Sequence, residues 1–305
     1  MSDFRKGSLR LFRWCGINVY LHWSWFLVAA WEIGDRGHAY SSVYWNEVEY
    51  LALFLIVTIH EFGHALACRQ VGGTADQIVL WPLGGLAYVN PPQRPGATLW
   101  SVTAGPLVNV ALLPVFTLLT MLSGSLGWAT AMPNLATLLR NLWLINLVLL
   151  IFNMLPIYPL DGGQILRSLL WFPLGRARSL MAASIIGFVG TFGLLALAWW
   201  MQSVWIALIG AFVVMNCWTG FQRARALSRF EKLPRHDGFA CPDCKVAPPV
   251  GNYWICNRCK NAFDTFQTRA VCPSCAAQFD VTRCLDCGKL RPLNQWIVTT
   301  APGIG

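Results

Sequence analysis

The sequence predicts an α-helical polytopic membrane protein that carries a small, cysteine-rich β domain at its C-terminal end. Of its 305 residues, 55% are hydrophobic and only 12% are charged, whereas soluble domains carry about 25% charged residues. Six apolar segments approach or exceed the roughly 20 residues that a helix needs to cross a bilayer. Eight of the eleven cysteines follow the last of these segments. We therefore expect two domains of different character.

The six predicted transmembrane helices lie near residues 17–33, 50–70, 99–122, 137–155, 179–200 and 203–221. Basic residues cluster before the first segment, after the fourth and after the sixth, while the loop between the first two is mainly acidic. This is the positive-inside pattern, and it predicts a multi-pass protein of the cell membrane with both termini in the cytoplasm. The net charge of +9 then reflects topology, and nucleic acid is not an expected partner.

The second segment contains the sequence His-Glu-Phe-Gly-His at residues 60–64. On a helix, this spacing puts the imidazoles of His60 and His64 one turn apart on one face, where both can bind one metal ion. Glu61 is then placed to take a proton from an attacking water. The alternative is a pair of structural histidines, but ionisable side chains at membrane depth are costly and usually belong to a functional site.

A catalytic zinc usually has three protein ligands and one open position, and Asp161 is the candidate for the third. It follows Pro156 and Pro159, which end the fourth apolar segment, and precedes Gly162 and Gly163, which allow a tight turn. Irregular backbone at membrane depth is tolerated where it lines a polar cavity. The alternative is an ordinary loop aspartate at the cytoplasmic face.

Two separated motifs, HEFGH and FNMLPIYPLDGG, resemble the site-2 protease family of intramembrane zinc metalloproteases, over roughly residues 15 to 220. The sequences LGGLA at 83–87 and AGPLVN at 104–109 add to the resemblance. It implies a catalytic Zn2+ held by His60, His64 and Asp161, with Glu61 as the general base. It also implies a membrane-associated β-hairpin over about 73–93 that engages an extended substrate. Asn109 is a candidate donor to the oxyanion, or alternatively a contact between helices.

Four CxxC pairs in the C-terminal part predict two structural Zn2+ sites of four cysteines each. Disulfides are disfavoured because this part is expected in the reducing cytoplasm, while iron–sulfur clusters remain an alternative. The first and second CxxC pairs are separated by 11 residues, and the third and fourth by 8. These gaps are compatible with two tandem zinc ribbons, and a cross-braced arrangement, in which the first pair joins the third, is the alternative. This portion resembles the double zinc ribbon family. The eight cysteines are Cys241, Cys244, Cys256, Cys259, Cys272, Cys275, Cys284 and Cys287.

The predicted organisation is a six-helix metalloprotease domain at 1–222, a basic linker at 223–238, a double zinc ribbon at 239–290 and a tail at 291–305. The expected function is hydrolysis of peptide bonds within or near transmembrane segments of membrane proteins, in regulated intramembrane proteolysis. One alternative is a catalytically inactive, membrane-anchored zinc-ribbon adaptor, and another is a metal transporter. The expected partners are a membrane-protein substrate, the lipid bilayer and a cytoplasmic protein that binds the ribbons.

Overall fold

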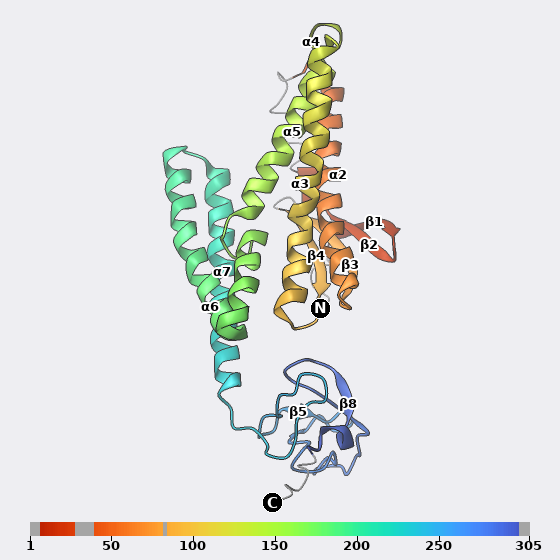
Figure 1. The fold of residues 1–305 in the computed structure, drawn as a ribbon, viewed down its shortest axis with the longest axis vertical. Helices are drawn as coiled ribbons and strands as arrows, with labels where there is room; N and C mark the ends of the chain where they lie inside the picture. The colour runs from red at the N-terminus through yellow and green to blue at the C-terminus, as the bar shows by residue number, and fades with distance from the viewer. Residues whose placement is uncertain (1–6, 28–39, 82–83, 299–305) are drawn as a thin grey trace, which may run out of the picture. The chain divides into compact units, whose positions relative to one another are not determined.

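The computed structural model describes residues 7–27, 40–81 and 84–298, which form two compact units, Met1–Arg225 and Ala226–Gly305. In the first unit, long helices accompany a small sheet (Figure 1). Its elements are β1 (Ser8–Trp14), β2 (Ile17–His22), α2 (Val43–Gln70), β3 (Thr74–Trp81), β4 (Gly84–Asn90), α3 (Pro95–Ser125), α4 (Trp128–Ala131), α5 (Pro133–Met154), α6 (Asp161–Trp200) and most of α7 (Val204–Glu231).

The four strands pair in the order β1-β2-β3-β4. The outer pairs are antiparallel, and β2 pairs with β3 in parallel because the chain passes through α2 between them. Apolar residues of β2 and β3, among them Ile17, Val19, Ile78 and Leu80, are buried and pack against α2 around Phe62. The sheet therefore lies against the part of α2 that carries the HEFGH sequence. The antiparallel strands β3 and β4 fall within the region 73–93.

The prediction of a helix over residues 17–33 is wrong at its start, because residues 17–22 form strand β2. Ile17 and Val19 are fully buried and alternate with the more exposed Asn18 and Tyr20, which is the two-residue period of a strand. Residues 24–27 are helical, and the remainder of that predicted segment, 28–33, lies outside the described residues. The apolar run that follows β2 obscured this alternation in the sequence.

Four helices in the described part of the chain, α2, α3, α5 and α6, are long and apolar enough to cross a membrane. They contain four of the six predicted segments, and the sixth segment lies in α7. α6 has 40 residues, about twice the length of one span, and its helical path is interrupted at Gly175 (φ 78°, ψ 176°). α6 therefore consists of two helical stretches, of which the second corresponds to the predicted segment 179–200.

The second unit is a small domain with two two-stranded sheets and little helix. α7 continues into it as far as Glu231, so the basic stretch 223–238 begins on a helix. The fold extends past residue 290, where the sequence placed the end of the ribbons, because Trp296 is buried in a cluster with Phe266, Cys241 and Cys284. Its further elements are β5 (Trp254–Ile255), β6 (Ala262–Phe263), β7 (Val281–Arg283), β8 (Leu290–Pro292) and the 3-10 helix η2 (Leu293–Trp296).

Candidate active site and metal centres

Three side chains that are distant in the sequence meet between α2 and the start of α6. The Nε2 atoms of His60 and His64 lie 3.1 Å apart. Asp161 Oδ2 lies 3.1 Å from Nε2 of His60 and 3.2 Å from Nε2 of His64. All three side chains are largely buried, with 13% or less of each exposed. The structure therefore brings together the three residues that the sequence marked as metal ligands.

The spacing of these three atoms fits a tetrahedral zinc ion. With ligand bonds of 2.0–2.1 Å, neighbouring donor atoms of a tetrahedral site lie about 3.3 Å apart, close to the 3.1–3.2 Å observed. Two nitrogens and one carboxylate oxygen are also a donor set that zinc accepts. Three ligands leave a fourth position for water or substrate.

Hydrogen bonds at the other ring nitrogens turn both imidazoles toward this centre. His60 Nδ1 lies 2.5 Å from Asn109 Oδ1, and His64 Nδ1 lies 2.9 Å from the Ser101 carbonyl oxygen. Both oxygens can only accept, so each Nδ1 must carry the proton and each Nε2 keeps its lone pair for a metal. Both acceptors belong to α3, which thus fixes the tautomers of two histidines on α2.

Asn109 forms two hydrogen bonds with Asn146 of α5. Asn109 Nδ2 donates to Asn146 Oδ1 at 2.8 Å, and Asn146 Nδ2 donates to the Asn109 carbonyl at 2.9 Å. Neither asparagine is exposed. Because the oxygen of Asn109 accepts from His60 and one of its two amide N–H groups donates to Asn146, these contacts favour a role in orienting His60 over the predicted role as oxyanion donor. The sequence analysis missed Asn146, although an amide within an apolar segment was a visible signal.

Glu61 and Gly105 complete the surroundings of the three ligands. The Glu61 side chain is buried, and its carboxylate lies within 4.8 Å of the histidine nitrogens. Gly105 of α3 packs directly on both imidazoles: a methyl group at this position would overlap the ring of His64 and lie 2.7 Å from His60 Nε2. A helix bearing any larger residue there could not approach the motif so closely.

The turn that carries Asp161 depends on the two glycines that follow it. The chain leaves α5 at Met154, and α6 begins at Asp161. Methyl groups at Gly162 and Gly163 would overlap the backbone of Met154 and of Ile157, respectively. The turn can therefore fold tightly onto the first turn of α6, where a carboxylate is also favoured by the helix dipole.

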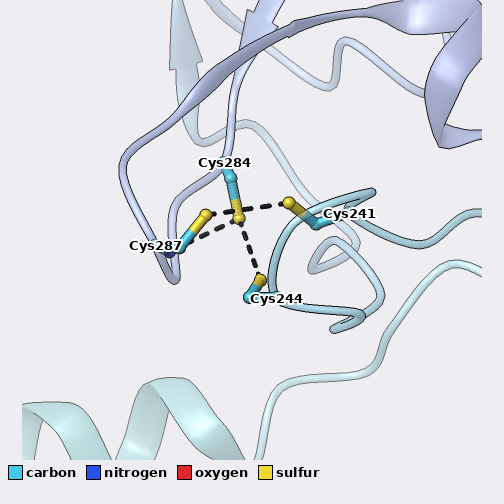
Figure 2. Close-up of side chains that lie close together, drawn as sticks. All are labelled: Cys241, Cys244, Cys284 and Cys287. Atoms are coloured by element: carbon cyan, nitrogen blue, oxygen red, sulfur yellow. Dashed lines mark hydrogen bonds between the residues drawn. The ribbon is translucent and has the colours of Figure 1, made fainter. Parts of the chain in front are cut away.

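The eight cysteines of the second unit form two groups of four. Figure 2 shows the first group, Cys241, Cys244, Cys284 and Cys287, with the four sulfurs turned toward one another. Its Sγ–Sγ distances from Cys241 to Cys287 and from Cys244 to Cys284 are both 3.7 Å. These distances fit the spacing of about 3.8 Å expected around a tetrahedral zinc with 2.3 Å bonds and exceed by far the 2.05 Å of a disulfide.

The second group contains Cys256, Cys259, Cys272 and Cys275, with corresponding Sγ–Sγ distances of 3.6 Å. The pairing is thus nested: the first CxxC pair joins the fourth, and the second joins the third. The tandem arrangement is wrong, and so is the cross-braced alternative. Nesting follows from the meeting of the two ends of the domain, where Ala240 N–H donates to the Trp296 carbonyl at 2.8 Å.

A buried aspartate, Asp264, organises the loop between Cys259 and Cys272, which joins the two CxxC pairs of the second group. Burial by itself would raise the pKa of Asp264, but donors around its carboxylate hold that pKa below the usual range. The Gly251 N–H donates to Oδ2 at 2.7 Å and His236 Nε2 lies 2.8 Å from the same atom, while the Phe266 N–H donates to Oδ1. Asp264 is therefore an ionised hydrogen-bond acceptor inside the domain.

Comparison with known proteins identifies the first unit. The family model described as peptidase family M50 matches residues 48–141 and 121–197. A zinc metalloprotease of Methanocaldococcus jannaschii is 33% identical over 180 residues, which cover 59% of this chain and 50% of that relative. A protein of Synechocystis sp. is 28% identical over 269 residues, 81% of this chain and 68% of its own length.

A solved structure, the site-2 protease from Methanocaldococcus jannaschii, matches with a TM-score of 0.52 and 27% sequence identity. The match covers 70% of this chain and 95% of that structure. The matched sequence includes both histidines, Glu61 and Asp161, since all four lie between residues 48 and 197. Residues 48–197 of the chain therefore match peptidase family M50, and the chain resembles the site-2 protease family of zinc metalloproteases.

Proposed function

We propose that this protein is a zinc endopeptidase that hydrolyses peptide bonds within or near transmembrane segments of membrane proteins. The observation that carries the proposal is the convergence of His60, His64 and Asp161 at 3.1–3.2 Å. The match to a family of zinc metalloproteases supports it, as do the four apolar helices that could span a membrane. Release of a protein from a membrane anchor, as in regulated intramembrane proteolysis, is the expected outcome of such a cleavage.

In the proposed mechanism, His60, His64 and Asp161 hold the metal through Nε2, Nε2 and a carboxylate oxygen. When bound, zinc acidifies water and polarises a carbonyl group. Glu61 takes the proton from the attacking water and returns it to the leaving amine, for which its buried carboxylate next to the ligands is suited. Asn109 keeps His60 in the tautomer and orientation that binding requires.

The substrate must present an extended segment, because helical hydrogen bonds protect its carbonyl groups. β4 is the outer strand of the sheet next to β3, and both strands contact α2. We propose that these two strands form the membrane-associated hairpin, and that the substrate adds to its edge through main-chain hydrogen bonds. This would hold a peptide close to the helix that carries both histidines.

The remaining features of the proposal concern topology and stoichiometry. We propose six membrane spans with both termini in the cytoplasm, a metalloprotease domain at 1–222, a basic stretch at 223–238, and a ribbon domain that continues past residue 290 to Trp296. Each chain would bind one catalytic zinc and two structural zincs, with the two groups of four cysteines as the structural sites. The ribbon domain would bind a cytoplasmic protein partner.

Two measurements on the full chain test the proposal together. Cleavage of a panel of single-span membrane proteins in vesicles should be abolished in Glu61→Gln, whereas zinc per chain should stay unchanged. In the variant His60→Ala/His64→Ala, we expect zinc to fall by about one per chain. Wild-type cleavage by Glu61→Gln would refute the mechanism. A metal content unchanged by loss of both histidines, with no cleavage by the wild type, would favour the inactive adaptor.

A further inference from the structure

An unusual set of arginines lies around α6 and α7. Between Gly162 and Phe230 the chain has six arginines but no lysine, aspartate or glutamate. The positive-inside rule accounts for basic residues at the cytoplasmic end of membrane helices, but it does not require them to be buried or close together. Three of the six, Arg167, Arg176 and Arg223, are drawn together by the packing of the helices.

Tyr158 packs against the parts of α6 and α7 that carry Arg167 and Arg223. Gly163 packs against the Tyr158 backbone, and Arg167 follows Gly163 by one helical turn on the same face of α6. On α7, a methyl group at Gly220 would lie 2.9 Å from the Tyr158 ring. Arg223 follows Gly220 by three residues, so it projects on the same side of its helix.

Arg176 joins the set from the second stretch of α6. It follows the interruption at Gly175, and the residues four and eight positions later, Leu180 and Ser184, are buried. Ser184 faces α7, since a methyl group at Gly220 would lie 2.8 Å from its hydroxyl oxygen. Arg176 therefore lies on the side of α6 that faces α7.

The positive charges of Arg176 and Arg223 both oppose that of Arg167. Arg167 is close enough to both Arg176 and Arg223 for their positive charges to act on it, and it is only partly exposed. Its Nε atom is buried and has no hydrogen-bond partner among the described residues. Holding a guanidinium group in this position without an anion is costly, because burial and like charge both disfavour it.

The surroundings of Arg167 are those of a membrane interface. Its guanidinium group lies over the ring of Trp171, 5.8 Å from the ring centroid, and tryptophan is enriched at the level of lipid headgroups. Guanidinium groups bind phosphate through two parallel hydrogen bonds, which suits a set made only of arginines. Basic pockets between membrane helices are also known to bind the headgroups of anionic lipids.

We propose that Arg167, Arg176 and Arg223 bind the phosphate group of an anionic phospholipid, between the start of α6 and the end of α7. The lipid would neutralise the three charges and connect the helical stretch that begins at Asp161 to α7. Phosphate binding at this site would not require the proposed protease activity. It would, in turn, stabilise the position of Asp161 by holding α6 in place.

The test uses the full chain, freed of lipid and returned to phosphatidylcholine vesicles with or without phosphatidylglycerol. The measurements are phosphatidylglycerol retained per chain, by native mass spectrometry, and the midpoint of thermal unfolding. We expect Arg167→Gln and Arg223→Gln to weaken phosphatidylglycerol binding by about fivefold each and to remove its effect on the midpoint. Arg178→Gln, at an exposed arginine of the same helix, is the matched control and should retain both.

Three results would overturn the proposal. The first is an equal loss of lipid binding in Arg178→Gln, which would show general attraction to a negative surface. The second is a rise in the midpoint of thermal unfolding with inorganic phosphate, in phosphatidylcholine vesicles alone, that equals the rise with phosphatidylglycerol. This would make the site one for free anions. The third is unchanged binding in Arg223→Gln. Because Arg223 is exposed, this variant decides the question even if Arg167→Gln does not fold.

Discussion

Replacing Asn146 with leucine keeps the number of side-chain heavy atoms and the branch at Cγ, and it removes two hydrogen bonds of 2.8 and 2.9 Å to Asn109. The amide N–H of Asn109 that donates to Asn146 would then be buried without a partner, at a cost of about 1–3 kcal/mol. Hydrogen bonds between membrane helices average about 0.6 kcal/mol, so we expect the lower end of that range. The protein should remain folded, with a modestly lower midpoint of thermal unfolding.

The larger expected effect is on zinc, because Asn109 orients His60. Loss of a partner that orients a metal-bound histidine costs about 10–100-fold in metal affinity. We expect a loss near the upper end for Asn109→Leu and near the lower end for Asn146→Leu. If Asn146 acts only through Asn109, the double variant should bind zinc no more weakly than Asn109→Leu alone.

Zinc per chain is measured while a chelator lowers the free zinc concentration, and His60→Ala/His64→Ala provides the baseline of the cysteine sites. Asn216→Leu is the control, since that partly exposed side chain donates to a carbonyl of its own helix at 2.8 Å. Wild-type zinc affinity in Asn146→Leu would refute the reasoning. Additive losses in the double variant would show that Asn146 acts by a route that does not involve Asn109.

Other substitutions test the remaining sites. Gly105→Ala should remove about one zinc per chain and abolish cleavage, because the added methyl group overlaps the His64 ring. Asp264→Asn should destabilise the cysteine-rich unit by about 2 kcal/mol, measured by denaturant unfolding. Since the pKa of Asp264 is lowered in the fold, its contribution is complete above pH about 4 and lost only below that, so the effect should be equal at pH 7 and pH 9. Chelation of zinc should unfold the cysteine-rich unit and leave the helical signal of the membrane part, observed by circular dichroism.

Matched variants separate these effects from general damage. Gly124→Ala lies on the same helix as Gly105 and meets no atom within 4 Å, so it should keep both zinc and cleavage. Asp280→Asn removes an exposed aspartate of the same unit and should leave unfolding unchanged. Equal zinc loss in both glycine variants would contradict the argument from the imidazole contact. A strong difference between pH 7 and pH 9 for Asp264→Asn would contradict an ionised carboxylate.

The sequence predicted the ligands of the candidate metal site better than the secondary structure and the helix contacts around that site. His60 and His64 were evident from spacing on one helix, and Asp161 from the broken helix and its glycines. The strand at Ile17 was missed because its two-residue alternation runs directly into an apolar segment. Asn146 was missed because its importance depends on which helix α5 contacts, and spacing within one segment does not contain that information.

The nested cysteine pairing was unpredictable for a related reason. The four CxxC pairs have the same internal spacing, so nothing local distinguishes one partner from another. The choice depends on where the ends of the domain meet. Trp296 contributes to that meeting because it packs with Phe266 around Cys241 and Cys284. Trp296 lies in the stretch predicted as a tail, 291–305, and it therefore helps to determine which cysteines form the first group.

Close backbone approach explains how the proposed catalytic residues reach one another from three helices. A methyl group at Gly63 would lie 2.7 Å from the Ala104 carbonyl of α3, and Gly105 packs on the imidazoles in return. Small residues allow membrane helices to approach in this way, since burial of apolar surface gives little drive for association in lipid. Backbone packing thus sets the positions of the ligands, and the two asparagines set the orientation of one ring. We infer that replacing these glycines with larger residues should remove the metal without unfolding the helices. Replacing the two asparagines should only lower the affinity for zinc.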